Sequence, residues 1–267
     1  MIRIGGVPEH FNMPWHIALE SGTGGLACEW HDYSTGTGAM LADLAAGKLD
    51  LGMLLTEGSA LGLARELPIE AVSLYTTTPL IWGLHVPSES DWQSVAELQG
   101  LRFAISRYGS GSHLMSLALA MEQGWPVADQ RFEIVDNLPG AIEAFSDGRA
   151  DVFMWEHYTT EPAVTAGHFR RLGDFVSPWP AWVVCVNADC WRQQQQAIKQ
   201  LLKTVAAAAT QLKTATDAPE QIALRYGLEA SAVAEWLAGV EWVKKVTPPQ
   251  SALASARRML EAAGEIS

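Results

Sequence analysis

Residues 101–124 read LRFAISRYGSGSHLMSLALAMEQG and contain a short apolar segment, a glycine- and serine-rich turn and a strongly helical segment. This order predicts a strand followed directly by a helix. Gly109 and Gly111 allow the backbone to approach a ligand closely, while Ser110 and Ser112 offer hydroxyl groups or an N-cap. Because a helix N-terminus also carries partial positive charge, the turn predicts a site for an anionic or acceptor-rich group. An ordinary capped turn is the alternative.

The same order of strand, turn and helix recurs along the chain. Alternating or continuous apolar patterns predict strands at 2–7, 26–33, 49–55, 69–77, 101–106, 131–136 and 150–156. Helical spacing predicts helices between them, at 14–21, 38–47, 56–65, 110–123 and 139–147. Strands separated by helices of about ten residues favour right-handed βαβ crossovers and a largely parallel sheet. The chain therefore belongs to the α/β class.

The second half of the chain changes character after another strand-like segment at 179–189. From Cys190 onward the pattern is almost entirely helical, and 191–213 has a long amphipathic face. These helices are too poor in strands to build a third sheet, so we expect them to return to the first sheet. This organisation predicts two lobes, 1–82 with 187–267 and 83–186, each with an open and mostly parallel sheet. Two β-like connectors then form a double-crossover hinge beside a ligand cleft.

Composition restricts the partners. The chain has 267 residues, 48% of them hydrophobic, and a formal charge of −12, which disfavours nucleic acid and acidic membranes and favours a small molecule. No apolar run reaches the roughly 18 residues of a membrane span, so no membrane insertion is expected. Three cysteines without paired CxxC spacing predict buried free thiols, not disulfides or structural zinc. No nucleotide motif occurs, and we expect neither a cofactor nor a metal.

The first residues, MIRIGGVPEHF, read directly as a strand, without a basic segment followed by an apolar one. The chain is therefore expected to be cytoplasmic as it stands, or periplasmic if a leader has been removed.

Ligands of open parallel sheets bind beyond the carboxyl ends of the strands, where helices begin. The candidate ligand-binding residues are those of the corresponding turns: His10, Asn12, Trp15, Thr37, Gly38, Thr56, Glu57, Ser106, Gly109, Ser110, Gly111, Ser112, His113, Trp155 and Glu156. We assign no catalytic residue.

Individual side chains suggest different roles. The Asn12 amide suits hydrogen bonding to a ligand, and Trp15 suits stacking, with a hydrophobic staple as its alternative. Glu57 and Glu156 suit an amine or a ring N–H, with capping of the helix that begins near Thr159 as the alternative for Glu156. Carboxylates and helix starts together predict a ligand with both donor and acceptor ends.

Three histidines leave an enzyme open as a second hypothesis. His10, His113 and His157 each fall in a predicted cleft turn and could act as general bases or metal ligands. No HxH or HExxH spacing supports a metal, and Ser112 with His113 are only sequence neighbours.

The segments GVPEHFNMPW, GTGAMLADLAAGKLDLGMLLTEG, SRYGSGSHLMSLALAMEQGW and GAIEAFSDGRADVFMWEHYTTEP together resemble the type 2 periplasmic-binding-protein superfamily. The resemblance is to the aliphatic-sulfonate and taurine binding proteins and the thiamine-pyrimidine synthases, closest to a subgroup of fungi and bacteria without a signal peptide and with an unnamed ligand. It implies a two-lobed Venus-flytrap protein that closes on a sulfonate, amino-acid-like or pyrimidine-like molecule. It also implies an ABC permease as a further partner.

Two departures from these relatives matter. The cysteine-rich CCCFC iron motif of the thiamine-pyrimidine synthases has no counterpart here, which argues against their chemistry. The sulfonate binders are exported with a leader and dock on a permease, whereas this chain starts at its first strand. The leading hypothesis is thus a solute-binding protein without enzymatic activity. A biosynthetic synthase or lyase that uses a cleft histidine is the alternative, and a ligand-sensing partner of a regulator or permease is a third class.

Overall fold

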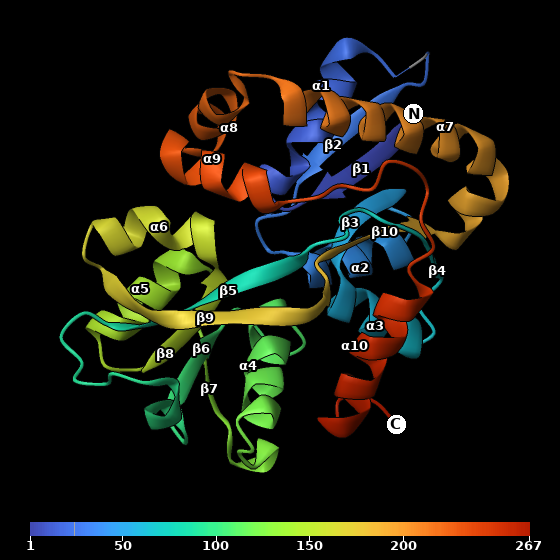
Figure 1. The fold of residues 1–267 in the computed structure, drawn as a ribbon. Helices are drawn as coiled ribbons and strands as arrows, with labels where there is room; N and C mark the ends of the chain where they lie inside the picture. Colours follow the sequence, from blue (N-terminus) through green and yellow to red (C-terminus); the bar gives the residue numbers. More distant parts are fainter. Residues whose placement is uncertain (24) are drawn as a thin grey trace. The chain divides into compact units, whose positions relative to one another are not determined.

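The computed structural model describes residues 1–23 and 25–267, which form two compact units (Figure 1). Unit 1 comprises Met1–Pro79 and Trp179–Arg257, and unit 2 comprises Leu80–Pro178 and Arg258–Ser267. Each unit is built on its own five-stranded sheet. The expected α/β class with two open sheets is confirmed.

The sheet of unit 1 has the strand order β2-β1-β3-β10-β4. Its strands and the helices between them are β1 (Ile2–Gly6), η1 (His10–Asn12), α1 (Met13–Ser21), β2 (Cys28–Asp32), α2 (Thr37–Ala45), β3 (Leu51–Leu55), α3 (Thr56–Ala64), β4 (Ile69–Leu74) and β10 (Trp182–Asn187). Strand β1 runs parallel to β2 and β3, whereas β10 is antiparallel to both β3 and β4. The sheet is therefore mixed, and not as largely parallel as the sequence pattern indicated.

Strand β10 explains this difference. All six of its residues are buried, as expected for a strand covered on both faces in the middle of a sheet. The chain returns to unit 1 beside the end of β3, where Thr56 N donates to Ala181 O at 3.0 Å. From that point β10 can only run back along β3, in the opposite direction.

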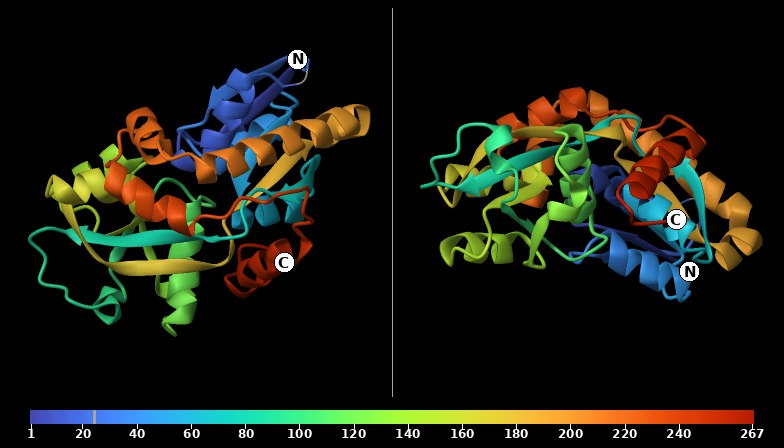
Figure 2. Two further views of the ribbon diagram at one scale, coloured as in Figure 1. Left: turned by 45° about the horizontal axis from the view of Figure 1, so that its top comes forward. Right: turned by 90° about the horizontal axis from the view of Figure 1, so that it is seen from below.

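The helices after β10 belong mainly to unit 1: α7 (Ala188–Thr214), α8 (Ala218–Tyr226), α9 (Ala230–Gly239) and α10 (Gln250–Ala262), the last of which ends in unit 2. Helix α7 begins where the Asn187 side chain accepts the N–H groups of Asp189 and Cys190. It buries the apolar face anticipated from its sequence and lies beside α1 (Figure 2). Helix α8 ends at Gly227, which has a left-handed backbone with φ +67°.

The sheet of unit 2 has the order β7-β6-β8-β5-β9. Its elements are β5 (Pro79–Pro87), η2 (Val95–Leu98), β6 (Arg102–Ile105), α4 (Gly111–Glu122), η3 (Val127–Asp129), β7 (Arg131–Ile134), α5 (Leu138–Ser146), β8 (Val152–Glu156), α6 (His157–Thr165) and β9 (Phe169–Pro180). Strand β6 is parallel to β7 and β8, whereas β5 is antiparallel to β8. The chain passes between the units within β5 and β9.

Strand β9 was not predicted, because Pro178 and Pro180 argue against a strand. The strand lies at the edge of the sheet, where a residue without a backbone N–H is tolerated. From Phe175 to Trp179 its residues alternate between buried and exposed, which fits an edge strand with one covered face.

The two units repeat one building plan, as the recurring sequence pattern predicted. The orders β2-β1-β3 and β7-β6-β8 correspond, and each carries the same ion pair at the amino end of its strands. Asp50 Oδ2 accepts the backbone N and Nε of Arg3 at 2.8 and 2.9 Å. Asp151 Oδ2 accepts the same two atoms of Arg102 at 2.9 and 3.0 Å. The first pair ties β1 to the start of β3, and the second ties β6 to the start of β8.

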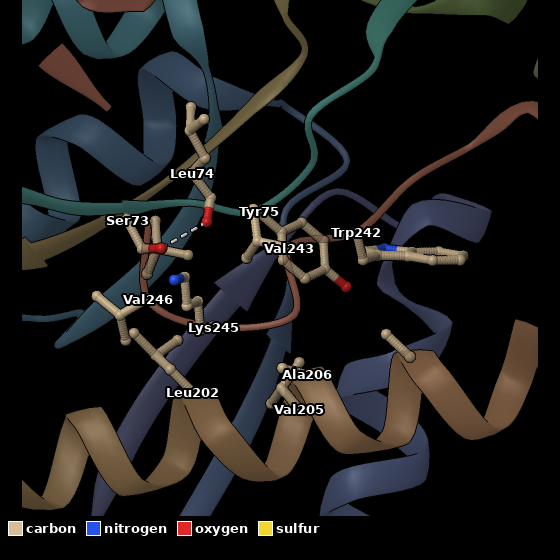
Figure 3. A pocket seen from close by; sticks show the side chains of 12 residues that line it. Ser73, Leu74, Tyr75, Leu202, Val205, Ala206, Trp242, Val243, Lys245 and Val246 are labelled. Carbon is tan, nitrogen blue, oxygen red and sulfur yellow. Dashed lines mark hydrogen bonds between the residues drawn. The ribbon is translucent and has the colours of Figure 1, made fainter. Parts of the chain in front are cut away.

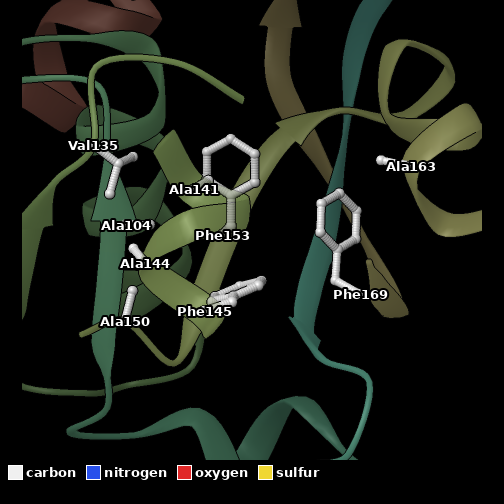
Figure 4. Packing of buried hydrophobic residues seen from close by; sticks show 9 residues of the cluster. All are labelled: Ala104, Val135, Ala141, Ala144, Phe145, Ala150, Phe153, Ala163 and Phe169. Atoms are coloured by element: carbon white, nitrogen blue, oxygen red, sulfur yellow. The ribbon is translucent and has the colours of Figure 1, made fainter. Parts of the chain in front are cut away.

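In the core of unit 2, side chains of α5 pack against side chains of the sheet (Figure 4). Small side chains of α5, Ala141 and Ala144, are buried and leave room for the rings of Phe145, Phe153 and Phe169. Ring centroids of Phe145 and Phe169 lie 6.0 Å apart with nearly perpendicular planes, a favourable aromatic geometry.

Candidate functional site

Three helical segments of unit 1 begin at one edge of its sheet. Strands β1, β2 and β3 run parallel, so their carboxyl ends share this edge, and η1, α2 and α3 follow them. The starts of α2 and α3 abut: Leu55 N donates to Thr37 Oγ1 at 3.2 Å, and a Cβ on Gly58 would lie 2.4 Å from the Thr37 methyl group. Thr37 therefore positions the turn that precedes Glu57, and Gly38 lies in the first turn of α2.

Glu57 is the chemically most unusual group at this edge. Its side chain is only 1% exposed and lies in the first turn of α3. Oε2 accepts the indole N–H of Trp179 at 2.9 Å, whereas Oε1 is buried and has no hydrogen-bond partner among the described residues. Burial raises the pKa of Glu57 to about 7, although its own backbone N–H and the Trp179 indole act to lower it. The carboxyl group therefore gains or loses its proton near neutral pH.

Asn12 contributes a second acceptor. Its Nδ2 donates to Val7 O at 2.8 Å, and its Oδ1 is buried without a hydrogen-bond partner in the described part of the chain. The turn that carries Asn12 is fixed from behind, because Phe11 O accepts both Tyr75 Oη at 2.8 Å and Trp242 Nε1 at 3.1 Å. The position of the turn thus depends on residues distant in the sequence.

A small apolar pocket lies between α7, the end of β4 and the segment that carries Trp242 (Figure 3). Tyr75 and Trp242 line it together with Leu202, Val205 and Ala206 of α7. Its lining is mostly hydrocarbon, so it offers few polar groups to a ligand. Tyr75 and Trp242 therefore link this apolar region to the η1 turn through their hydrogen bonds to Phe11 O.

Aromatic rings surround the η1 turn. Phe11 lies 5.7 Å from Trp182 and 5.1 Å from Trp236, measured between ring centroids. His10 is 1% exposed and its ring meets Trp236 edge-on at 4.2 Å. Such a setting suits a flat or cationic group better than a strongly hydrated anion.

Two other candidates of unit 1 have structural contacts. Trp15 is fully buried in the core, 6.3 Å from the ring of Trp30 and 6.4 Å from that of Tyr75. Thr56 is also fully buried, and its hydroxyl donates to the carbonyl of Pro180. Ligand contact by either side chain stays a prediction.

The turn from β6 into α4 in unit 2 is a closed hydrogen-bond network. Ser110 caps the helix by accepting His113 N at 3.3 Å, and ligand binding at this turn stays a prediction. Ser112 Oγ accepts Ser106 N at 3.0 Å and lies 3.1 Å from Ser110 Oγ. Gly109, with a left-handed φ of +76°, donates its N–H to His113 Nδ1 at 3.2 Å. The structure thus brings five of the candidates together, and α4 begins beside them at Gly111.

His113 itself is held neutral. Burial lowers its pKa to about 4, and its ring packs edge-on against Tyr108 at 5.1 Å and Phe132 at 4.7 Å. Because Nδ1 accepts from Gly109, the ring proton sits on Nε2. A neutral imidazole of this kind can donate one hydrogen bond from Nε2.

Glu156 and Trp155 follow β8 at the same edge of unit 2. Glu156 Oε2 accepts both the backbone N and the hydroxyl of Thr159 at 2.7 Å, so it caps the start of α6. Trp155 stacks on Phe153 at 5.2 Å and packs against the core. Ligand contact by these two residues stays a prediction.

The histidines have separate environments. His157 Nδ1 lies 2.8 Å from Asp174 Oδ1, and its Nε2 lies 3.0 Å from Arg171, which makes it part of an ion-pair network. Among the described residues, no group of three or more His, Cys, Asp or Glu side chains could hold a metal ion. All three cysteines are free, as predicted, with Cys185 and Cys190 buried and Cys28 half-buried.

Sequence reasoning missed the tryptophans that complete these edges. Trp179 donates to Glu57 in unit 1. Trp182 in unit 1 and Trp82, which pairs with Glu156 in unit 2, each have a buried indole N–H without a partner among the described residues. The run SPWPAWVV, residues 177–184, carried the signal for Trp179 and Trp182, since it places two tryptophans among prolines directly before a β-branched segment.

The sheet orders and connections of the two units define the class of protein: the chain has the periplasmic-binding-protein fold. The similarity to solved structures agrees. The CA3427 gene product of Candida albicans, described as defining a family with the generic periplasmic-binding-protein fold, has a TM-score of 0.92 and 24% identity, covering 100% of this chain and 91% of that one. The alkanesulfonate-binding protein SsuA of Xanthomonas axonopodis pv. citri, bound to MOPS, has a TM-score of 0.85 and 20% identity, covering 100% and 94%.

More particularly, residues 82–175 match the model of the Ca3427-like family of periplasmic binding proteins, which confirms the resemblance carried by the sequence motifs. The periplasmic aliphatic sulphonate binding protein SsuA of Escherichia coli is also similar, with a TM-score of 0.73 and 18% identity over 99% of this chain and 88% of that one. None of the curated proteins matches the chain. In the part of the chain that the structure describes, every helix is too short or too polar to cross a membrane.

Proposed function

We propose that this protein is a binding protein that closes its two units on one small organic molecule. Glu57 is the observation that carries the proposal: a fully buried carboxyl group with one unpartnered oxygen, at the strand edge where α/β sheets bind ligands. Support also comes from the fold, which this chain shares with proteins described as sulfonate-binding proteins.

The two edges differ in what they would offer a ligand. The α4 turn of unit 2 offers a helix N-terminus and a neutral His113, which suit an acceptor-rich end such as a sulfonate or carboxylate. The edge of unit 1 offers acceptors and aromatic rings. Sulfonates, amino-acid-like molecules and pyrimidines remain the ligand classes of this proposal. An ABC permease and a periplasmic location belong to it as well, by analogy with the sulfonate-binding relatives.

A screen of the wild-type protein tests the proposal. Sulfonates, amino acids and pyrimidines are added while the melting temperature and the tryptophan fluorescence are recorded. A ligand present at about 100 times its Kd stabilises the folded state by about 2.7 kcal/mol, which is measurable as a raised melting temperature. Small-angle scattering of the same samples should show a smaller radius of gyration with ligand.

Native mass spectrometry of protein purified from its host is a second test of ligand binding, and it does not depend on the choice of compounds. We expect one co-purified molecule of low mass. A protein that carries no molecule and responds to none of the compounds is not a binding protein of this kind.

A further inference from the structure

We infer that the ligand presents a nitrogen group with N–H donors to unit 1, and that Glu57 Oε1 and Asn12 Oδ1 accept them. An ammonium, an amidinium or an aminoheterocycle has this chemistry. The inference rests on the proposed function and names the part of the ligand that unit 1 selects.

The first argument is the count of unpartnered acceptors. Glu57 is 1% exposed and Asn12 is 2% exposed, and each keeps one oxygen without a hydrogen-bond partner among the described residues. Both lie at one edge, because β1 and β3 are parallel neighbours with Ile4 opposite Leu51. A buried acceptor left unsatisfied costs about 1–3 kcal/mol, and more when it is charged. A ligand with two N–H donors would remove this cost at both positions.

The second argument is electrostatic. No cationic side chain is among the causes of the Glu57 pKa, which are burial, its own backbone N–H and the Trp179 indole. A cationic ligand group would supply the missing positive charge. A sulfonate at the same place would face the carboxylate and be repelled, so the acidic end of a zwitterion must lie elsewhere.

The third argument is the shape and chemistry of the surroundings. Phe11 precedes Asn12 in the chain, and its ring lies 5.7 Å from that of Trp182, which pairs with Leu55, two residues before Glu57. Aromatic faces favour cations and flat heterocycles. The Trp182 indole N–H is buried and has no partner in the described part of the chain, so it can donate to an acceptor next to the ligand's N–H group. Aminoheterocycles carry donor and acceptor side by side.

Proton release follows from this assignment. The pKa of free Glu57 is about 7, and a bound cation favours the carboxylate, so binding below about pH 7 should expel a proton. Of the elements packed on α3, β10 brings the titratable thiol of Cys185, whose pKa burial raises to about 12, so it stays neutral. The α2 side chains next to α3, those of Thr37 and Leu41, are uncharged. Strand β3 has no titratable side chain, and Glu70 of β4 is exposed. Affinity for an N–H ligand should therefore rise with pH through neutrality.

Matched compounds test the inference by calorimetry. Each pair exchanges an amino group for a methyl group: taurine and propanesulfonate, β-alanine and butyrate, aminopyrimidine and methylpyrimidine. In every pair that binds, we expect the amino member to bind at least about tenfold more tightly, as for a hydrogen bond to a charged group. Its binding at about pH 6 should release a proton, detected by comparing buffers of different ionisation enthalpy.

Two variants complete the design. Glu57→Gln retains an oxygen for the Trp179 indole but turns the free oxygen into a donor, so it should abolish the preference for the amino member. Glu70→Gln removes an exposed carboxylate of β4 in the same unit and should retain the preference. Melting curves of both variants show whether the fold is intact.

The outcomes separate the inference from the proposed function. Equal or tighter binding of the methyl members, or an unchanged preference in a folded Glu57→Gln, overturns the inference and leaves the binding function in place. If no pair binds, native mass spectrometry decides: a co-purified molecule with an N–H nitrogen supports the inference, and one without it overturns the inference. A protein that carries no molecule refutes the proposed function itself.

Discussion

Replacing Glu57 by glutamine should change how the stability of the protein depends on pH. Burial raises the pKa of Glu57 from 4.5 to about 7, so the fold prefers the protonated form. Its stabilising contribution is fully present below the unfolded pKa and is lost as pH rises through the folded pKa. Since one pKa unit corresponds to about 1.4 kcal/mol, ionisation of Glu57 costs the folded state about 3 kcal/mol above neutrality.

Glutamine has no proton to lose, so the variant escapes this cost. At about pH 4 the two proteins should have nearly equal free energies of unfolding, because Glu57 is then mostly protonated in the unfolded chain as well as in the folded state. At about pH 8.5 the variant should gain about 3 kcal/mol relative to the wild type, which corresponds to roughly 6–12 °C in melting temperature for a chain of this size. Urea unfolding and melting curves between these pH values measure the difference directly.

The comparison contains its own control. Glu70→Gln, which alters an exposed carboxylate, should follow the wild-type pH profile. Parallel profiles for the wild type and Glu57→Gln would refute the reasoning, because they would mean that Glu57 ionises in the folded state as easily as in the unfolded chain.

Three further predictions concern unit 2. Gly140→Ala places a Cβ 2.0 Å from Val135 O, a backbone atom that cannot move without distorting the chain. The free energy of unfolding should therefore fall by about 1–3 kcal/mol. An unchanged melting temperature would contradict the packing of α5 in this structure. Ser110→Ala removes the cap that accepts His113 N and should lose about 1 kcal/mol in urea unfolding, and an unaltered midpoint would show that the cap is not stabilising. Burial lowers the pKa of His85 to about 3, so the stability that it contributes is present above pH 6.5 and is lost as pH falls from there. The stability gap between the wild type and His85→Gln should therefore narrow by about 2 kcal/mol between about pH 6.5 and 5, and a constant gap would refute the assignment.

Local contacts in this protein could be read from the sequence. The cap at Ser110 joins residues three positions apart, and so does the cap that Glu156 makes to Thr159. The apolar face of α7 follows from helical spacing alone. In each case the interacting groups lie within one or two helical turns, so the residue pattern determines the contact.

Contacts between distant segments could not be predicted in the same way. The partner of Glu57 is Trp179, 122 positions away, and the η1 turn is held by Trp242, 231 positions from Phe11. The sequence placed Glu57 at a strand end, but only the return of β9 and β10 shows that one oxygen is occupied and the other is not. The mixed direction of the sheet depends on the same return.

The carboxyl-end edges of the two sheets have the same strand order but differ in how their polar groups are hydrogen-bonded. Both units end a β-strand in a helix start, yet the polar groups of the α4 turn satisfy each other through Ser110, Ser112 and His113. In unit 1, the corresponding acceptors of Asn12 and Glu57 have no such neighbours. A turn whose polar groups hydrogen-bond to one another leaves no buried polar group unsatisfied, so it does not lower the stability of the fold. It offers a ligand mainly the helix N-terminus, which can bind many acceptor groups with little discrimination. An edge that keeps unsatisfied acceptors loses stability until the right donor arrives, and this loss is what lets it discriminate between ligands. We therefore expect substitutions at the edge of unit 1 to alter which molecule binds, and those in the α4 turn to alter mainly how tightly it binds.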